Sequence, residues 1–326
     1  HTRYIGDWSS DVCSSDLILS FLLWFATENI NVFFFLFIIL IANIFFEIGQ
    51  AFYNSQLINF KGRKNYGEFS GTAWAFGYLG GITCLAVILA FFIIPEEPLF
   101  KLSESKYENI RICGPTVGLW FLIFSIPFLI NCKNNSSSKQ KHSFSKFIAT
   151  LMELKKDKNK INFFIARMLY TDGLITLFSF GGIYATGVFN FSFNDIIIFG
   201  IAINITAALG AYIFGFIEDK IGIKKVILIS LIFLILICLV ILIVNNKTYF
   251  WVLGTMIGLF IGSIQSSSRT ALINLSSSKN INSSFGIYAT SGKVTNFLGP
   301  LLVATFTAVF QSQKAGMATI VFFLFL

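Results

Sequence analysis

Long apolar runs separated by short polar stretches make up most of this chain. Eight of the runs are long enough, at roughly 20 residues each, to cross a bilayer as a helix. They are continuously apolar rather than alternating, which favours helices over a membrane β-barrel. The pattern therefore predicts an all-α, polytopic membrane protein. The eight runs are 33–53, 72–94, 114–131, 162–186, 196–217, 225–245, 250–268 and 285–309, and shorter runs lie at 17–26 and 317–326.

The composition excludes an ordinary soluble enzyme. Hydrophobic residues make up 55% of the 326 residues, charged residues make up 12%, and the mean hydropathy is +0.76. A typical soluble domain is about 25% charged. The net charge of +8 fits basic loops beside a membrane better than a nucleic-acid site. We therefore expect the lipid bilayer as a partner and no nucleic acid.

Basic residues also predict the orientation. The polar stretch 132–161 holds eight of the 24 basic residues, and such loops stay on the cytoplasmic side. Alternation of the spans then places 54–71, 218–224 and 269–284 on the same side. If the source is a prokaryote, the cytoplasmic membrane is the expected location.

The two ends of the chain are expected to be incomplete. Residues 1–16 contain no Phe, Lys or Asn, although these residues are common elsewhere. This leader resembles a translated sequencing adapter, and the alternative is a short polar tail. At the other end, the last apolar run stops before it is long enough to span. The expected domains are a partial N-terminal helical half at 17–131, a linker at 132–161 and a C-terminal half at 162–326.

A short internal repeat links the two halves. The segments 55–60 (SQLINF) and 270–275 (TALINL) each follow one apolar run and precede another. The runs are six helices apart and have the same predicted orientation. Two six-helix halves in a parallel repeat are the arrangement of major facilitator transporters.

The polar turn at 215–225 (GFIEDKIGIKK) carries the strongest local signal. Glycine at the first position permits close helix packing, and a second glycine permits a tight turn. The aspartate can accept hydrogen bonds from a helix N-terminus or pair with a cation. The turn resembles the loop signature of the major facilitator superfamily, which implies a gating role, and the alternative is a plain charged turn. The gating residues are Gly215, Asp219, Lys220, Gly222, Lys224 and Lys225.

Two acidic residues lie inside apolar runs, where ionisable groups are costly and usually face a cavity or a partner. Asp172 lies about 15 Å into its span, near the midplane, and could carry a proton or bind a substrate amine. Glu47 lies deep in the 33–53 run. For both residues, a purely structural hydrogen-bonding role is the alternative. Arg167 is interpreted as an interfacial side chain that extends to water.

Three further polar residues are candidates for contact with a substrate or ion. Lys293 lies inside its run and needs a counter-charge or water. Gln265 and Arg269 are four residues apart and share a helix face. An anchor at the membrane edge is the simpler reading of Arg269. The glycine sets 254, 258, 262 and 77, 80, 81 are interpreted as packing devices.

The sequence gives no sign of an enzyme. Its five cysteines form no paired motif, and its two histidines lie outside the apolar runs. We therefore expect no metal site and no disulfide framework. A phosphate-binding loop of the Walker type is absent from the sequence, so ATP is not expected to drive this chain. No cofactor is expected.

Several segments in this order resemble the vacuolar effluxer family, the autophagy-related-protein-twenty-two-like branch of the major facilitator superfamily. The resemblance implies a twelve-helix transporter, of which the chain would hold the end of the third helix to part of the twelfth. Fungal members are associated with amino-acid efflux from the vacuole. The segments are 51–55 (AFYNS), 77–81 (GYLGG), 170–173 (YTDG), 215–225, 265–269 (QSSSR), 285–288 (FGIY), 292–293 (GK) and 299–300 (GP).

These observations predict a secondary transporter that works as a monomer by alternating access. The expected partners are a small solute, with amino acids as the first candidate, and protons. The alternative is a non-transporting membrane scaffold or a lipid scramblase. A scramblase would tolerate loss of the Asp172 carboxylate, whereas a coupled transporter should not.

Overall fold

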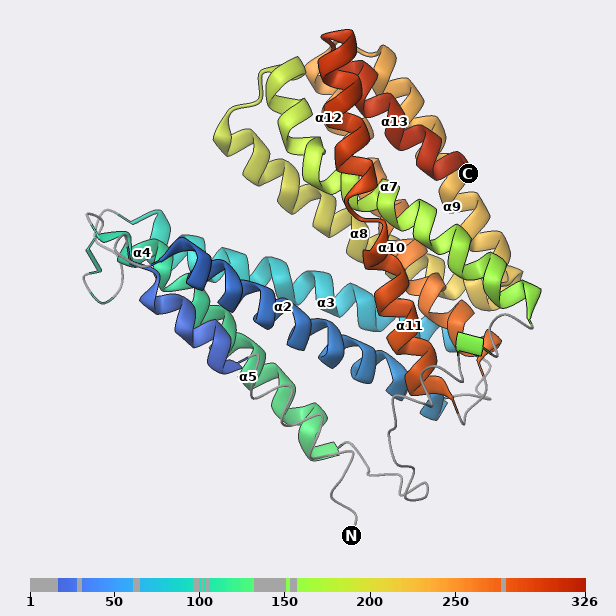
Figure 1. The fold of residues 1–326 in the computed structure, drawn as a ribbon, viewed down its shortest axis with the longest axis horizontal. Coiled ribbons are helices and arrows are strands. Elements are labelled where there is room, and N and C mark those ends of the chain that lie inside the picture. The colour runs from blue at the N-terminus through green and yellow to red at the C-terminus, as the bar shows by residue number, and fades with distance from the viewer. Residues whose placement is uncertain are drawn as a thin grey trace. The chain divides into compact units, whose positions relative to one another are not determined.

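Helices form all of the regular secondary structure in the part of the chain that the computed structural model describes (Figure 1). That part comprises residues 17–27, 31–60, 65–95, 100, 102–103, 106–131, 151–152, 157–276 and 280–326. Eight of its helices are long and apolar enough to cross a membrane, and they coincide with the eight predicted spans. The predicted all-α, polytopic fold class is confirmed.

The helices follow one another with short connections. In the first part of the chain they are η1 (Leu23–Phe25), α2 (Val32–Ser55), η2 (Gln56–Phe60), α3 (Tyr66–Ile88), its π-helical continuation η3 (Leu89–Ile93), α4 (Glu108–Arg111) and α5 (Cys113–Asn131). In the second part they are α7 (Lys158–Phe189), α8 (Phe193–Ile221), α9 (Ile223–Ile243), α10 (Lys247–Leu275), α11 (Ile281–Val294), α12 (Leu298–Phe310) and α13 (Gln313–Phe325).

Several helices extend beyond the predicted runs, and α3 begins at Tyr66 rather than 72. Helix α7 begins at Lys158 rather than 162, because the Asp157 side chain accepts hydrogen bonds from the backbone N–H groups of Asn159 and Lys160 and so caps the helix. The run 285–309 is not one helix, because residues 295–297 interrupt it between α11 and α12. The predicted leader 1–16 and most of the predicted linker lie outside the described residues.

The chain divides into two compact units. Unit 1 comprises residues 1–54 and 81–143, and unit 2 comprises residues 55–80 and 144–326. Helix α3 is therefore shared, with its first half in unit 2. In unit 1, Arg111 donates hydrogen bonds to the Trp24 carbonyl and lies over the Trp24 ring, which ties α4 to η1. The predicted domain boundaries stay a prediction.

Unit 2 is centred on α10, the most buried of the spans. Its glycines at 254, 258 and 262 lie against Phe199, Ile203 and Ala207 of α8, so the two helices approach closely and the packing role predicted for this stripe is confirmed. A Cβ added at Gly77, Gly80 or Gly81 would meet no atom within 4 Å. The packing role predicted for those three stays a prediction.

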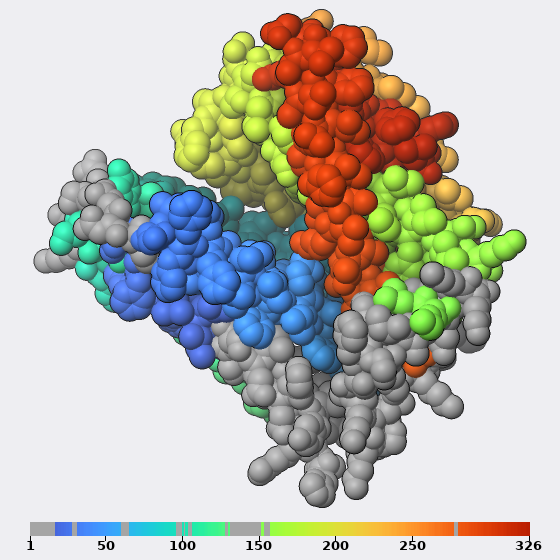
Figure 2. All heavy atoms as spheres, in the orientation of Figure 1, coloured from blue at the N-terminus to red at the C-terminus, as the bar shows by residue number. Residues whose placement is uncertain are grey.

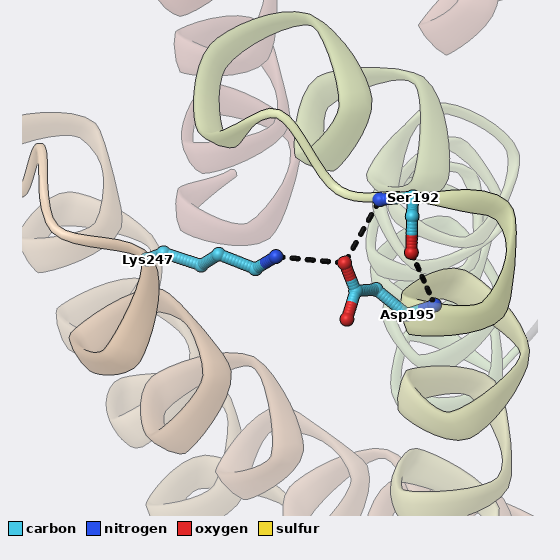
Figure 3. A network of polar contacts seen from close by, with 3 residues as sticks. All are labelled: Ser192, Asp195 and Lys247. Atoms are coloured by element: carbon cyan, nitrogen blue, oxygen red, sulfur yellow. Dashed lines mark hydrogen bonds and ion pairs between the residues drawn. The ribbon is translucent and has the colours of Figure 1, made fainter.

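Polar contacts fix the first turns of α8 and α10 at one end of unit 2 (Figure 3). Ser192 and Asp195 form a reciprocal capping box at the start of α8, with hydrogen bonds of 2.9 and 3.2 Å. The Lys247 ammonium, in the first turn of α10, lies 2.7 Å from the Asp195 carboxylate. The opposite ends of the same two helices carry the first candidate site.

Candidate functional site

Asp219, near the end of α8, caps the first turn of α3 within unit 2. Its two carboxylate oxygens accept hydrogen bonds from the backbone N–H groups of Gly67, at 2.7 Å, and Glu68, at 2.9 Å. These donors have no partner inside their own helix, and the positive end of the helix dipole favours a carboxylate there. The helix-terminus role, one of the two that the sequence allowed for Asp219, is therefore the one observed.

Small residues bring the two helices together at this cap. A Cβ added to Gly67 would lie 2.6 Å from the Gly215 carbonyl oxygen, and one added to Gly215 would lie 2.7 Å from the Gly67 carbonyl oxygen. Gly71 lies against the backbone of Ala211 and Gly215 in the same way. The chain then turns through Gly222, whose φ of 95° is a conformation that residues with side chains rarely adopt. The lysines of the gating turn, at 220, 224 and 225, are exposed.

Arg269 of α10 is buried against the first half of α3. Its Nε donates to Ser70 Oγ at 3.1 Å, and its Nη2 donates to the Ser70 carbonyl at 2.8 Å. The guanidinium also lies 6.0 Å from the centre of the Trp74 ring. An anchor at the membrane edge would keep its charge in water, so that interpretation of Arg269, which is only 4% exposed, is wrong.

Gln265, one turn before Arg269 on α10, also contacts α3. Its Oε1 accepts a hydrogen bond from the Tyr78 hydroxyl. Gln265 and Arg269 therefore use one face of α10 toward α3, as their spacing predicts. Beside them, the buried Glu218 of α8 accepts a hydrogen bond from Ser267 Oγ at 2.5 Å. The result is a buried polar cluster that joins α3, α8 and α10, and we call Ser70, Glu218, Gln265, Ser267 and Arg269 the α3 cluster.

Asp172 of α7 lies at a second place, against the start of α12. Its side chain is fully buried. Oδ1 accepts a hydrogen bond of 3.4 Å from the Gly299 backbone N–H, and Oδ2 has no hydrogen-bond partner among the described residues. Thr176 packs beside it and donates to the Asp172 carbonyl. Gly299 leaves the room for this approach, since a Cβ there would lie 3.2 Å from Oδ1.

Arg167 ties the first half of α7 to α11. Its Nη1 donates to the Tyr288 carbonyl at 2.6 Å and to Ser291 Oγ at 3.0 Å, and its guanidinium lies 3.4 Å from the centre of the Tyr288 ring. Gly292 makes room for this contact. The side chain is 9% exposed. The prediction that Arg167 extends to water is therefore wrong.

Two predicted site residues belong to neither place. Glu47 lies on α2 in unit 1 and is half-buried. Lys293 lies near the end of α11 and is exposed. Contact of Glu47 and Lys293 with a solute therefore stays a prediction.

Comparison with known proteins identifies the family. The model of the family described as "Vacuole effluxer Atg22 like" matches residues 61–326. The chain belongs to this family. The match confirms the resemblance that the motifs indicated, and three of those motifs, 170–173, 285–288 and 299–300, lie together where α7 meets α11 and α12.

The curated relatives of this Atg22-like chain are distant. It is 21% identical over 289 residues to the "Uncharacterized MFS-type transporter YxiO" of Bacillus subtilis, covering 87% of this chain and 67% of that protein. It is 21% identical to "Autophagy-related protein 22" of Yarrowia lipolytica and 23% identical to that of Kluyveromyces lactis, covering 80% and 79% of this chain. The chain spans 49% and 55% of those two fungal proteins.

Solved structures confirm the major facilitator fold for the Atg22-like chain. The transporter FucP in the outward conformation matches with a TM-score of 0.72 and 14% identity, covering 97% of this chain and 80% of that one. A second structure, of the E. coli fucose:proton symporter FucP, matches with a TM-score of 0.68 and 16% identity, covering 97% and 83%. The Atg22-like chain is thus a multi-pass integral membrane protein.

Sequence reasoning missed several residues of these sites. Ser70, Glu218 and Ser267 were not predicted, because their partners come from other helices. One signal was available, since Gly67 and Gly71 form a small-xxx-small spacing of the kind that marks close helix contacts. A second signal was Pro300, because proline is common in the first turn of a helix and so marks the start of α12.

Proposed function

We propose that the protein is a secondary transporter that moves a small solute across the membrane by alternating access. The observation that carries this proposal is the cap of α3 by Asp219. It is a contact between two helices that consists of two hydrogen bonds and close glycine packing, so it can break and re-form without disrupting either helix. The major facilitator fold and the names of the relatives, which are transporters and an effluxer family, agree with this proposal.

The gating role follows from where the capped end lies. The predicted orientation places the α8–α9 turn and the start of α3 on the cytoplasmic side. With the cap formed, α3 is held against α8 and α10, and the α3 cluster adds further hydrogen bonds. With the cap broken, the first turn of α3 has two N–H donors without partners. We propose that this difference favours one of the two conformations of the transport cycle.

Asp172 is the proposed coupling group. Burial of a carboxylate in a membrane span costs free energy, so the fully buried Asp172 side chain indicates a functional or structural role. The unpartnered Oδ2 leaves it able to take up a proton or an amino group. Amino acids are the proposed solute class, because the family resemblance points to amino-acid efflux and because a carboxylate suits a substrate amine. Gln265 and Arg269 would stabilise the gate, while Glu47 and Lys293 remain candidates for solute contact.

Reconstitution into liposomes tests this proposal. Uptake of a mixed amino-acid pool would be followed with and without an imposed pH gradient, for the wild type, Asp172→Asn and the control Asp195→Asn. We expect gradient-driven uptake that only Asp172→Asn loses, because Asp195 caps the start of α8 and pairs with Lys247 there. Absence of amino-acid flux in the wild type would refute the solute class, and lipid movement without solute flux would favour a scramblase.

A further inference from the structure

The span from Ile281 to Phe310 is interrupted in its interior. Helix α11 ends at Val294, residues 295–297 form a turn, and α12 begins at Leu298 (Figure 1). Within the turn, the Asn296 N–H donates to the Lys293 carbonyl and the Leu298 N–H donates to the Thr295 carbonyl. Non-helical backbone at membrane depth is tolerated where it is buried in protein or lines a cavity. In interrupted helices, such backbone commonly forms ion sites.

Buried side-chain oxygens without partners gather at this interruption. Thr295 Oγ1 and Asn296 Oδ1 belong to the turn itself, and both are buried and have no hydrogen-bond partner among the described residues. Asp172 Oδ2 is in the same state, and its other oxygen contacts Gly299, three residues after Asn296. Buried polar atoms are nearly always hydrogen-bonded, so a group of unpartnered oxygens indicates a missing partner. All three can act as acceptors, so a cation or a hydrogen-bond donor would satisfy them.

The arginine of α7 has partners other than Asp172. Arg167, on the same helix, is directed to Tyr288 and Ser291, and Lys293 is exposed. The Gly299 N–H and the positive end of α12 both favour negative charge on the carboxylate. A carboxylate buried in a membrane span is stabilised by a bound cation or by a proton.

We propose that a sodium ion binds between the Asp172 carboxylate and the α11–α12 turn, with Thr295 Oγ1 and Asn296 Oδ1 as further ligands. Carboxylate, hydroxyl and amide oxygens suit a hard cation. One carboxylate supplies one negative charge, which matches a monovalent ion. Ca²⁺ takes six to eight oxygen ligands, usually with several carboxylates. This proposal departs from the expectation of no metal site, which rested on the cysteines and histidines of the sequence.

Sodium binding at this site does not depend on the proposed function, but a role for sodium in transport rests on it. In a secondary transporter, sodium would compete with the proton proposed above for the Asp172 carboxylate. Figure 2 shows α12 on the near face of unit 2 in that view. Movement of α12 relative to α7 would open or close the site. Ion occupancy and helix movement would then depend on each other.

Binding of radioactive sodium to the purified protein in detergent tests the site without any transport. We expect saturable binding in NaCl diluted with choline chloride at constant ionic strength. Asp172→Asn should abolish binding, and Thr295→Val and Asn296→Ala should each weaken it about tenfold or more. Thr305→Val is the matched control, because the Thr305 hydroxyl is also on this span but bonds the Leu301 carbonyl of its own helix.

Several outcomes would overturn the site. The first is the absence of saturable sodium binding to the wild type, and the second is equal sodium binding by the wild type and Asp172→Asn. The third is that protons displace all of the bound sodium and that Thr295→Val binds sodium as tightly as the wild type. Size-exclusion profiles and circular dichroism would show whether each variant is folded. If Asp172→Asn does not fold, sodium binding by Thr295→Val still tests the site. Proton-driven transport by a wild-type protein that shows no saturable sodium binding would overturn the site but leave the proposed function intact. Sodium binding by a protein that transports no solute would support the site and overturn the proposed function.

Discussion

Replacing Asp219 by Asn should weaken the cap on α3 without changing the shape of the side chain. The amide keeps one acceptor oxygen, so one of the hydrogen bonds to Gly67 and Glu68 is lost together with the negative charge. Loss of a helix cap costs about 0.5–2 kcal/mol. Loss of charge at a helix N-terminus costs about 0.3–1 kcal/mol. We therefore expect a total of about 1–2 kcal/mol, since the two effects overlap.

That free energy corresponds to a change of roughly 5- to 30-fold in the equilibrium between the capped and uncapped states. Hydrogen–deuterium exchange, read by mass spectrometry on peptides that contain residues 66–71, measures it directly, because local opening sets the exchange rate. Exchange at Gly67 and Glu68 should speed up by this factor. The effect should shrink in high salt, since Asp219 is exposed and its charge is screened.

Asp157→Asn provides the matched control. Asp157 caps α7 through one oxygen, Oδ1, which accepts hydrogen bonds from Asn159 and Lys160. Asn keeps this acceptor, so the variant should change exchange at the start of α7 only through the lost charge and leave residues 66–71 unchanged. Equal exchange of residues 66–71 in the wild type and Asp219→Asn would refute the cap, and a change of the same size in Asp157→Asn would show a general loss of stability instead.

Further substitutions test the packing and the polar contacts. Gly67→Ala places a Cβ 2.6 Å from the Gly215 carbonyl oxygen, so it should lower the melting temperature in detergent by an amount that corresponds to about 1–3 kcal/mol. Arg269→Gln removes charge-assisted hydrogen bonds, worth about 1.5–3 kcal/mol, and denaturant unfolding should show the loss. Tyr184→Phe should have the melting temperature of the wild type or a higher one, because the Tyr184 hydroxyl is buried without a partner among the described residues. Tyr170→Phe should have a lower melting temperature than the wild type, because the Tyr170 hydroxyl is hydrogen-bonded. Stabilities of the two tyrosine variants in the opposite order would contradict this explanation.

The spans and the turn at Gly222 could be predicted because their signals are local. A run of apolar residues has the length of a bilayer whatever it packs against. Gly222 supplies a backbone conformation that the turn itself requires. Asp219 could be linked to a helix N-terminus, but the sequence could not say which helix, since Gly67 is 152 residues away.

The α3 cluster and the interruption between α11 and α12 could not be predicted from local signals in the same way. The contact of Arg269 with Ser70 joins residues 199 apart, and only packing decides that the guanidinium is buried. The interruption before α12 did leave a signal in Pro300, which lies in the first turn of that helix, where a missing N–H costs nothing. The uninterrupted apolar character of 285–309 concealed this signal, because hydropathy does not distinguish one long helix from two short ones.

Exchange across liposome membranes tests alternating access most directly. Labelled amino-acid uptake would be compared between empty liposomes and liposomes preloaded with unlabelled amino acids, with the protein reconstituted in both. An alternating-access carrier exposes its site to one side at a time, so internal solute should accelerate its return and raise the labelled uptake. Uptake that is the same in empty and preloaded liposomes would indicate a pore and would contradict the account.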